Sequence, residues 1–401
     1  MRYLFIDYGA THIKCCTYNK EKEELDNFQK FECPKNIYQH PRYEIPINEV
    51  SSITEEIFKN HLFDAVLMCS QMHGFCLSSD NKILTDYISW KDESGEVFLN
   101  PNIKSRTGIT PRKGIPVFNI NNVVKNLGVK KYKILTLPEA VINSLGSFTN
   151  KTHDTMICGL GTHDIISGQP NLDIMETLYE SPSFNETISE LQIVGSYVKN
   201  NKEIPIYSPV GDMQCALFGA ELSEGQISVN LGTGSQVSVI AKQINPETDN
   251  RRFFDGRVLN TITHIPSGRA IDCYINFFRQ IGYRENFWQR VNSYSIDEIL
   301  ESTIGFDFNV FGSSAGSIYN LLESNLTQNN LEASLIKAYV YQYKKHVEVF
   351  EGDSLLLSGG IVKNCPIICD LFKEIMGKNI ITTQTEIDET LLGMKKLVEQ
   401  I

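Results

Sequence analysis

Residues 4–14 read LFIDYGATHIK, and residues 227–239 read ISVNLGTGSQVSV. Each segment has the pattern of an apolar strand, a turn rich in Gly or Thr, and a second strand. Glycine lets a turn approach a ligand closely, and successive N–H groups in such a turn form a concavity that binds anions. An ordinary glycine turn explains either hairpin alone equally well. The pair predicts a duplicated fold that holds a nucleotide from both sides.

The side chains around these two turns suit a phosphate chain and its metal ion. Thr11 and Thr233 can add hydroxyl donors to the backbone N–H groups. Asp7 stands at the mouth of the first hairpin. Mg²⁺ is commonly bound through one or two carboxylates while it keeps waters and phosphate oxygens. The first hairpin therefore predicts a phosphate site with a magnesium carboxylate.

The composition is that of a globular protein with more than one domain. The chain has 401 residues, of which 41% are apolar and 21% charged, enough for two or three domains. A net charge of −11 argues against nucleic acid or an anionic membrane as partner. No apolar run approaches the ~20 residues of a membrane span. The ten scattered cysteines, without a Cys-x-x-Cys pair, indicate a reducing compartment, so we expect a cytoplasmic protein.

Strand and helix patterns alternate along both halves and predict an α/β fold with mixed sheets. The expected strands are residues 3–7, 13–18, 27–32, 65–69, 354–357 and 379–382. The expected helices are residues 137–145, 212–219, 271–281, 330–348 and 362–376. Ser52 and Glu55 have the spacing of a capping box at a further helix start. The proline-bearing stretch 205–209 is expected to separate the two halves.

Asp212 is the strongest candidate for a catalytic residue. It follows Gly211 at the start of the helix expected over 212–219. An Asp in that place is more often a helix cap than a catalyst. The alternative is a general base that takes the proton of a substrate hydroxyl during phosphoryl transfer. Its position shortly before the second phosphate hairpin favours the catalytic role.

A group of polar residues follows the buried strand 65–69 and suits a sugar. Ligands of open α/β sheets bind beyond the carboxyl ends of the strands. Gln71 and His73 lie there, in Gln71-Met72-His73-Gly74, and can bind hydroxyls as donors and acceptors. A histidine satisfied within a turn is the alternative. Trp90 and Asp92 offer an aromatic face and a carboxylate, a common pair in sugar sites.

A glycine pair marks the second half of the expected nucleotide site. Gly359 and Gly360 follow the buried strand 354–357, and Lys363 and Asn364 come at the next helix. This arrangement fits a close approach of the backbone to an adenine and its ribose. A plain turn between a strand and a helix is the alternative.

Together, these motifs and their order resemble the FGGY carbohydrate kinases of the sugar kinase/Hsp70/actin superfamily. The resemblance extends over almost the whole chain. Its motifs are Asp7-x-Gly9-x-Thr11 with Lys14, Gln71-Met72-His73-Gly74, Trp90-x-Asp92, Gly211-Asp212-x-Gln214, Asn230-x-Gly232-Thr233-Gly234, the segment Gly359 to Pro366, and Leu392-Gly393. The resemblance implies two actin-like, ribonuclease H-like domains with ATP and a sugar between them. We expect domains at residues 1–208, on the sugar side, and 209–401, on the nucleotide side.

The resemblance also implies a role for each matched residue. Asp212 would be the base, and Asp7 would act on Mg²⁺ through a water. The expected sugar-binding residues are Gln71, Met72, His73, Gly74, Trp90, Asp92 and Gln214. The expected nucleotide-binding residues are Gly9, Thr11, Lys14, Gly232, Thr233, Gly234, Gly359, Gly360 and Asn364. ATP and Mg²⁺ are the implied cofactors.

Within this family the motifs look closest to those of ketose kinases. Gln71-Met72-His73-Gly74 looks like xylulokinases and sedoheptulokinases, and Ile265-Pro266-Ser267-Gly268-Arg269 looks closest to sedoheptulokinases. Sedoheptulose is therefore the first expected substrate, ahead of xylulose and other polyols. The chain is short for the family, and Glu93-Ser94 replace the arginine that often follows Trp-x-Asp. The second interpretation is a sensor that binds sugar or nucleotide without turnover. The sequence leaves the oligomeric state open, with a homodimer as one alternative.

Overall fold

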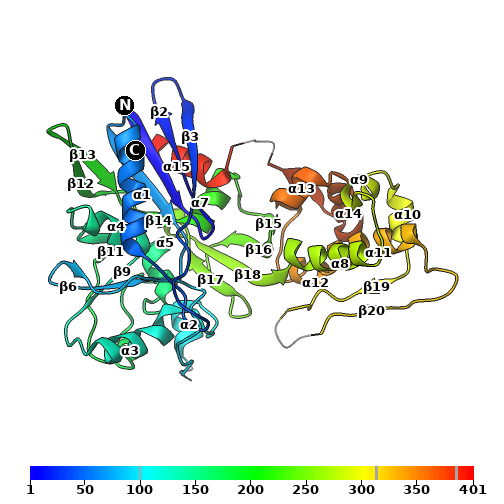
Figure 1. The fold of residues 1–401 in the computed structure, drawn as a ribbon, viewed down its shortest axis with the longest axis horizontal. Helices are drawn as coiled ribbons and strands as arrows, with labels where there is room; N and C mark the ends of the chain where they lie inside the picture. The colour runs from blue at the N-terminus through cyan, green and yellow to red at the C-terminus, as the bar shows by residue number, and fades with distance from the viewer. Residues whose placement is uncertain (99, 101, 312–314, 384–386) are drawn as a thin grey trace. The chain divides into compact units, whose positions relative to one another are not determined.

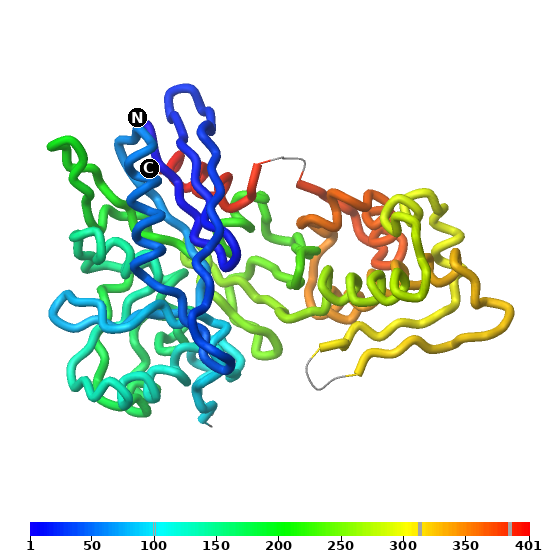
Figure 2. The backbone as a smooth tube through the Cα atoms, viewed as in Figure 1, coloured from blue at the N-terminus to red at the C-terminus, as the bar shows by residue number. Residues whose placement is uncertain are grey.

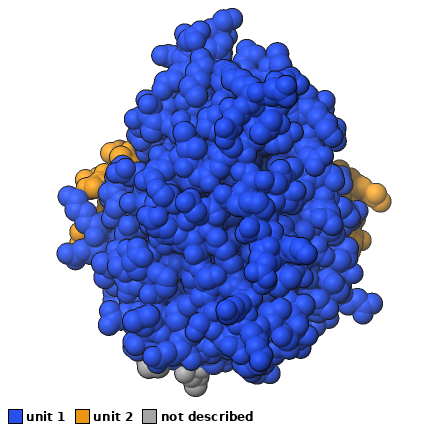
Figure 3. Space-filling view, turned by 90° about the vertical axis from the view of Figure 1, so that its left-hand side faces the viewer, with its two compact units in different colours: residues 1–221, 241–259, 386–401 blue, residues 222–240, 260–385 orange. Residues whose placement is uncertain are grey.

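The computed structural model describes residues 1–98, 100, 102–311, 315–383 and 387–401 (Figures 1 and 2). The chain forms two compact units, shown in different colours in Figure 3. Unit 1 comprises Met1–Glu221, Ala241–Leu259 and Glu386–Ile401, and unit 2 comprises Leu222–Ile240 and Asn260–Thr385. The sequence-based boundary between residues 208 and 209 falls inside unit 1, and it stays a proposal about domains.

The central sheet of unit 1 has seven strands and is mixed, as expected. Its order is β12-β13-β5-β1-β2-β3, and β14 also pairs with β5. β1 pairs antiparallel with β2 and parallel with β5. The strands are β1 (Arg2–Tyr8), β2 (His12–Asn19), β3 (Glu24–Glu32), β5 (Ala65–Ser70), β12 (Ile193–Lys199), β13 (Lys202–Tyr207) and β14 (Val210–Gly211). β1 therefore occupies the middle of the sheet, and its carboxyl end carries Asp7.

Alternation along β1 places helices on both faces of this sheet. Leu4, Ile6 and Tyr8 belong to one apolar core with side chains of α1 (Ile47–Asn60) and α4 (Leu137–Ser144). Successive side chains of a strand point to opposite faces. Asp7 therefore faces the other way, where it meets α15 (Glu389–Glu399) through Thr390. Figure 1 shows α1 and α15 beside the strands of this sheet.

The helices α7 (Asp212–Gly219) and α15 pack together at unusually short range. A Cβ atom on Gly393 of α15 would lie 1.9 Å from the carbonyl oxygen of Cys215. A Cβ atom on Gly219 would lie 2.0 Å from the carbonyl oxygen of Glu389. The two backbones therefore touch where each helix has a glycine, which sets the position of α15 against the sheet.

Smaller elements complete unit 1. They include the three-stranded sheet β7-β6-β9 and two pairs, β4 with β8 and β10 with β11. The strands of these small sheets are β4 (Glu44–Ile45), β6 (Cys76–Ser79), β7 (Lys82–Ile83), β8 (Tyr87–Ile88), β9 (Lys133–Leu135), β10 (Lys151–His153) and β11 (Glu186–Ile188). Unit 1 also contains β17 (Asp249–Arg252), which is not part of them. The helices are α2 (Asn102–Thr107), α3 (Pro116–Leu127), α5 (Asp154–Ile157) and α6 (Leu172–Met175). A second apolar core joins α3 to β9 and the residues around Leu160.

Unit 2 repeats the strand pairing of unit 1. β15 (Gln226–Leu231) pairs antiparallel with β16 (Gly234–Ala241) and parallel with β21 (Ser354–Ser358). β18 (Val258–Pro266) lies beyond β16, and β22 (Asn379–Thr382) lies beyond β21. β15 thus has the same two kinds of neighbour as β1, which confirms the duplicated design predicted from residues 4–14 and 227–239.

An extensive apolar core lies in unit 2. It joins side chains of β15 and β21 to the helices α8 (Gly268–Gln280), α11 (Gln328–Tyr341) and α14 (Ile367–Met376). The other elements are α9 (Phe287–Val291), α10 (Ile296–Glu301), α12 (Lys344–Val347), α13 (Gly360–Asn364), β19 (Gly305–Phe306) and β20 (Ile318–Tyr319). Within the described residues of the whole chain, we find no helix with the length and apolar character that a bilayer span requires.

One local sequence-based prediction is wrong. The capping box at Ser52 and Glu55 does not start a helix, because α1 already begins at Ile47 and the Ser52 hydroxyl donates to the carbonyl of Asn48 at 2.9 Å inside it. A capping box does form at Thr136 and Glu139. The first residues of the stretch 205–209 continue β13, whose alternating isoleucines are buried in the unit 1 core, and the separation of two halves at this stretch stays a proposal.

Two long helices expected from the sequence are each broken. The helix expected over 330–348 ends at Tyr341, where the N–H of Tyr343 donates to the carbonyl of Val340 and tightens the last turn. The helix expected over 362–376 divides into α13 and α14 at Pro366, which has no N–H to continue the helical bonds.

Candidate active site

Asp7 is a buried carboxylate with three polar neighbours, all in unit 1. Its side chain is 3% exposed. Its Oδ2 accepts a hydrogen bond from the Thr390 hydroxyl at 3.0 Å and lies 3.5 Å from the Lys14 ammonium. The Cys69 thiol donates to Oδ1 at 3.4 Å. Burial raises the pKa of Asp7, while Lys14 acts to lower it.

Lys14 connects Asp7 to a second carboxylate that the sequence analysis did not identify. The Lys14 ammonium lies 2.6 Å from Oδ2 of Asp388. Asp388 caps α15, where its Oδ1 accepts from the N–H of Thr390 at 3.1 Å. The single hydrogen of the Thr390 hydroxyl is shared between this oxygen, at 2.6 Å, and Oδ2 of Asp7. Burial acts to raise the pKa of Asp388, but the ammonium of Lys14 and the Thr390 bonds lower it overall. An aspartate in the N-cap position of α15 was the feature of the sequence from which Asp388 could have been found.

Asp212 is the first residue of α7, and Gly211 occupies the cap position. Asp212 is therefore not the N-cap residue of α7, which was the alternative to a catalytic role. Its Oδ1 accepts a hydrogen bond from the N–H of Met213 at 2.7 Å. Burial, and then the charge of Asp7, raises the pKa of Asp212 to about 7. A carboxylate with a pKa near the working pH suits a general base.

The donor set around Asp7 fits a magnesium ion that arrives with phosphates. Among the residues that the structure describes, no group of three or more His, Cys, Asp or Glu side chains could hold a metal ion. Mg²⁺ does not need such a cage, because it keeps waters and phosphate oxygens when one carboxylate is near. Among the described residues, Oδ1 of Asp7 accepts only from the weak thiol donor of Cys69, so it can accept a further hydrogen bond from a water on the metal.

A small cavity in unit 1 brings together three of the expected sugar-binding residues. Its volume is about 10 Å³. Met72, His73 and Gln214 line it, and Arg251 and Arg252 were not anticipated. The other lining residues are Ile109, Thr155, Cys158, Gly159, Ile165 and Asn250. A hydrogen bond of 2.6 Å between the His73 Nδ1 and the Gly159 carbonyl fixes the His73 ring.

The remaining sugar-side residues do not line this cavity. Asp92 is buried, and its carboxylate accepts from the N–H groups of Tyr43 at 2.7 Å and Ser94 at 3.0 Å. Trp90 is 39% exposed. Gln71 is buried, and within the described structure both of its amide atoms lack a hydrogen-bond partner. Gly74 leaves no room for a side chain, since a Cβ atom would lie 2.2 Å from the Tyr87 hydroxyl. Sugar binding by these four residues stays a prediction.

The first hairpin turn and Lys14 lie at one end of β1 and β2. The N–H of Gly9 donates to the carbonyl of His12 at 3.1 Å and closes the turn. Thr11 is exposed at the tip of this turn. Its hydroxyl is therefore accessible, as a phosphate ligand requires.

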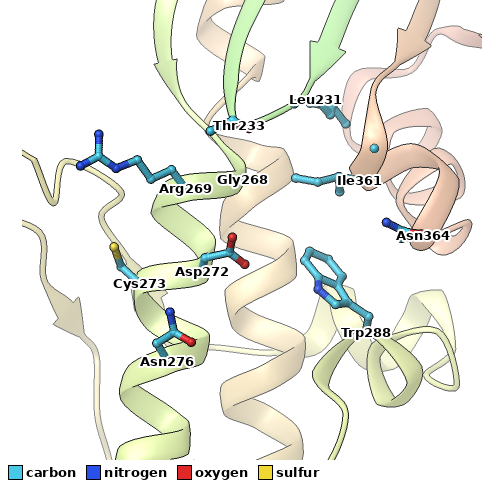
Figure 4. Close-up of a pocket in the computed structure, with 12 residues that line it drawn as sticks. Leu231, Thr233, Gly268, Arg269, Asp272, Cys273, Asn276, Trp288, Ile361 and Asn364 are labelled. Atoms are coloured by element: carbon cyan, nitrogen blue, oxygen red, sulfur yellow. The ribbon is translucent and has the colours of Figure 1, made fainter. Parts of the chain in front are cut away.

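Unit 2 contains a cavity of about 620 Å³ (Figure 4). Volumes of 300–1,000 Å³ are typical of small-molecule sites. Four of the expected nucleotide-binding residues line it together, namely Gly232, Thr233, Gly360 and Asn364. Gly234 and Gly359 do not line it.

Gly359 acts through the backbone instead. Its φ is 101°, and a Cβ atom would lie 2.6 Å from the carbonyl oxygen of Leu231. Only glycine fits a turn this close to β15. Gly359 thereby lets α13, which carries Gly360 and Asn364, begin beside the second hairpin turn.

Most of the other residues that line this cavity come from α8 and α9, which the sequence analysis did not assign to a site, and Leu231 and Ile361 complete the lining. Gly268, Asp272 and Asn276 recur every four residues along α8, and Arg269, Cys273 and Ile361 also line the cavity. The N–H groups of Gly268 and Arg269 donate to the carbonyls of Gly232 and Thr233 at 3.0 and 3.1 Å. Figure 4 shows the Trp288 ring directed into the space between Ile361 and Asp272. The helical spacing in α8 was a usable signal, but the expected helix began too late, at residue 271.

Comparison with solved structures identifies the fold. The chain matches a ligand-bound xylulose kinase from Lactobacillus acidophilus with a TM-score of 0.84, 15% identity, and coverage of 100% of this chain and 89% of that chain. It matches a glycerol kinase with ADP from Plasmodium falciparum with a TM-score of 0.82 and 15% identity, over 99% and 88% of the two chains. A gluconate kinase from Lactobacillus acidophilus gives 0.81 and 15%, over 100% and 89%.

These matches show that the chain has the fold of carbohydrate kinases, the fold that the resemblance to the FGGY family implies. The α/β class and the mixed sheets predicted from the sequence are confirmed with it. No protein-family model matches this sequence, and no curated protein matches it.

Proposed function

We propose that the protein is a carbohydrate kinase of the FGGY type, which transfers the γ-phosphoryl group of ATP to a hydroxyl of a sugar or polyol. The observation that carries this proposal is the state of Asp212. This carboxylate stands at the start of α7 with a pKa raised to about 7, and the buried charge of Asp7 contributes to that shift. The fold of solved carbohydrate kinases supports the same conclusion.

Each part of the proposed site has a defined task in this reaction. Asp212 takes the proton of the acceptor hydroxyl, whose oxygen then forms the new bond to the γ-phosphorus while the bond to ADP breaks. Asp7 orients a water of the magnesium ion, and Lys14 and Thr390 hold the Asp7 carboxylate in place. Magnesium neutralises charge on the phosphates when it is bound. In unit 2 the backbone around Gly232 and Thr233 suits a phosphate chain.

The substrate within this class is a narrower proposal. The sequence motifs favour a ketose, with sedoheptulose ahead of xylulose. Among the solved structures of this fold are kinases of xylulose, gluconate and glycerol, so the fold accommodates ketoses, sugar acids and small polyols alike.

A coupled assay of ADP release with Mg²⁺ tests the activity. The panel contains sedoheptulose, D- and L-xylulose, ribulose, glycerol, pentitols and sugar acids. ADP release that depends on one acceptor and yields its phosphate ester supports the kinase. If ATP binds and no acceptor on the panel is phosphorylated, the protein is instead a sensor that binds without turnover.

Trp288 provides a direct test of the nucleotide half. We expect ATP to quench the fluorescence of Trp288, since its ring lies in the 620 Å³ cavity where a base can stack on it. Stacking of a base on an aromatic ring contributes ~1–3 kcal/mol, so Trp288→Ala should weaken ATP binding by about 5–150-fold. The fluorescence measurement uses the Trp90→Phe background, which leaves Trp288 as the only tryptophan, and calorimetry gives the ATP affinity of Trp288→Ala. Unchanged ATP affinity in Trp288→Ala would place the base elsewhere.

A further inference from the structure

A buried polar cluster lies beside the start of α7, outside the groups assigned to the reaction. It consists of His153, which caps α5, and of Asp154 and Thr155 in α5 itself. Each of these three residues is 1% exposed. α5 lies against β14, the short strand that ends at Gly211 directly before Asp212 (Figure 1). Polar groups buried this completely are normally hydrogen-bonded, so their partners show what the cluster holds.

Thr155 binds the backbone directly before Asp212. The N–H of Gly211 donates to its Oγ1 at 3.1 Å. β14 also pairs with β5, so this bond fastens the same short strand to α5. The His153 ring orients the hydroxyl, since its Nδ1 lies 2.9 Å from Oγ1. Whichever of these two atoms carries the shared hydrogen, Oγ1 keeps a lone pair for the N–H of Gly211.

Asp154 reaches the first turn of α7 through Arg252. Its Oδ2 lies 2.7 Å from Nε of Arg252. The carbonyl of Arg252 accepts from the side-chain amide of Gln214 at 3.0 Å. Gln214 follows Asp212 in α7, whereas Gly211 precedes it. α5 therefore holds the chain on both sides of Asp212.

The chain has little freedom at Gly211. A Cβ atom there would lie 2.4 Å from Oε1 of Gln214 and 2.8 Å from the sulfur of Met72. Gly211 is the N-cap of α7 and has no side chain to bond the helix. Removing the Thr155 hydroxyl would leave a buried N–H without its acceptor, and the start of α7 is expected to shift. Misplacing a reacting group by about 1 Å costs on the order of 10²-fold in rate.

We propose that Thr155 is a positioning residue for Asp212. Its hydroxyl holds the N–H of Gly211 and thereby sets where the Asp212 carboxylate meets the acceptor hydroxyl. The inference rests on the proposed kinase function and adds a residue to its mechanism. Thr155 also lines the small cavity of unit 1, so the alternative is a hydroxyl that binds the acceptor directly.

The experiment combines single substitutions with a double-mutant cycle. Thr155→Val removes the hydroxyl and keeps the shape of the side chain, and Thr155→Ser keeps the hydroxyl. The matched control is Thr187→Val in β11, because the buried Oγ1 of Thr187 has no partner among the described residues. The ADP-release assay gives kcat and the KM of the acceptor for each variant, with Asp212 and with Asp212→Asn. Hydrogen exchange of residues 209–216 is measured in the same full-length proteins.

We expect Thr155→Val to lower kcat by about 10–100-fold, with little change in the KM of the acceptor. Thr155→Ser should retain most of kcat, and Thr187→Val should retain all of it. In the Asp212→Asn background, Thr155→Val should have almost no further effect, because residues that act as a unit are not additive. Hydrogen exchange of residues 209–216 should be faster in Thr155→Val, relative to exchange in α1.

Three results would overturn the inference. The first is an unchanged kcat in Thr155→Val. The second is a raised KM with an unchanged kcat, which would make Thr155 a ligand of the acceptor. The third is an equal loss with Asp212 and with Asp212→Asn, which would mean that Thr155 acts independently of Asp212. If Thr155→Val does not fold, Thr155→Ala removes the same hydroxyl and gives the same comparisons.

The kinase proposal and this inference fail in different ways. If the unmodified protein phosphorylates no acceptor, the kinase proposal fails, and hydrogen exchange decides the role of Thr155. Faster exchange of residues 209–216 in Thr155→Val then keeps Thr155 as the support of α7, and unchanged exchange removes it. If the unmodified protein is an active kinase and Thr155→Val matches it, the kinase stands and the positioning role fails.

Discussion

Replacing Asp212 with Asn is expected to lower kcat by ~10²–10⁴-fold, the usual contribution of a general base. Asn keeps the shape of the side chain and an oxygen that can accept from the N–H of Met213. The start of α7 should therefore persist, and only the ability to take a proton is removed. Steady-state kinetics with the best acceptor measures the loss, and a variant that retains near-normal kcat would remove Asp212 from the mechanism.

The pH profile is the matched control for this assignment. Burial raises the pKa of Asp212 to about 7, and a base acts only in its ionised form. Activity of the unmodified protein should therefore be present above about pH 7 and fall as the pH drops through that value. The residual activity of Asp212→Asn should not show this limb. An identical limb in both proteins would assign it to another group.

Replacing Gly393 with Ala is expected to lower the free energy of unfolding by about 3 kcal/mol, at the upper end of the usual cost of overpacking. The added Cβ would lie 1.9 Å from the carbonyl oxygen of Cys215, and a backbone atom has little room to move. Because α15 carries Thr390, a displaced α15 would also weaken the support of Asp7. Urea unfolding gives the stability, and kcat should fall in the same variant.

Gly360→Ala serves as the control for stability alone. Gly360 begins α13, and a Cβ atom there would meet nothing within 4 Å. Alanine favours helix more than glycine does by about 1 kcal/mol, so this variant should unfold at the same or a higher urea concentration. If Gly393→Ala shows the same urea midpoint as the unmodified protein, the contact between α7 and α15 does not constrain the fold.

Local patterns predicted the elements of the fold well. The strand β22 and the helix α7 have the bounds expected from the sequence, Asn379–Thr382 and Asp212–Gly219. Both hairpins form where the glycine turns indicate. These features depend on neighbours in the sequence, namely alternation in a strand and the residues of a turn.

The candidate site was predictable only in part, because much of it depends on residues far apart in the chain. Asp7 was evident from its hairpin, but Thr390, which binds it, lies 383 positions away. Arg251 belongs to a short strand with no motif, and only the folded chain brings it to the cavity lined by His73 and Gln214. A sequence pattern does not report which distant residues line one cavity.

The bond between Thr390 and Asp7 also bears on the order in which the protein is made. The ribosome delivers the first strand early, and domains generally fold from the N-terminus during synthesis at ~5–20 residues per second. The Asp7 carboxylate nevertheless receives its Thr390 and Asp388–Lys14 supports only when α15 emerges. At that rate roughly 20–80 s separate the two events. A nascent chain would thus have both hairpins while the Asp7 carboxylate still lacks these supports, so in the proposed kinase Asp7 is held in place only after α15 has been made.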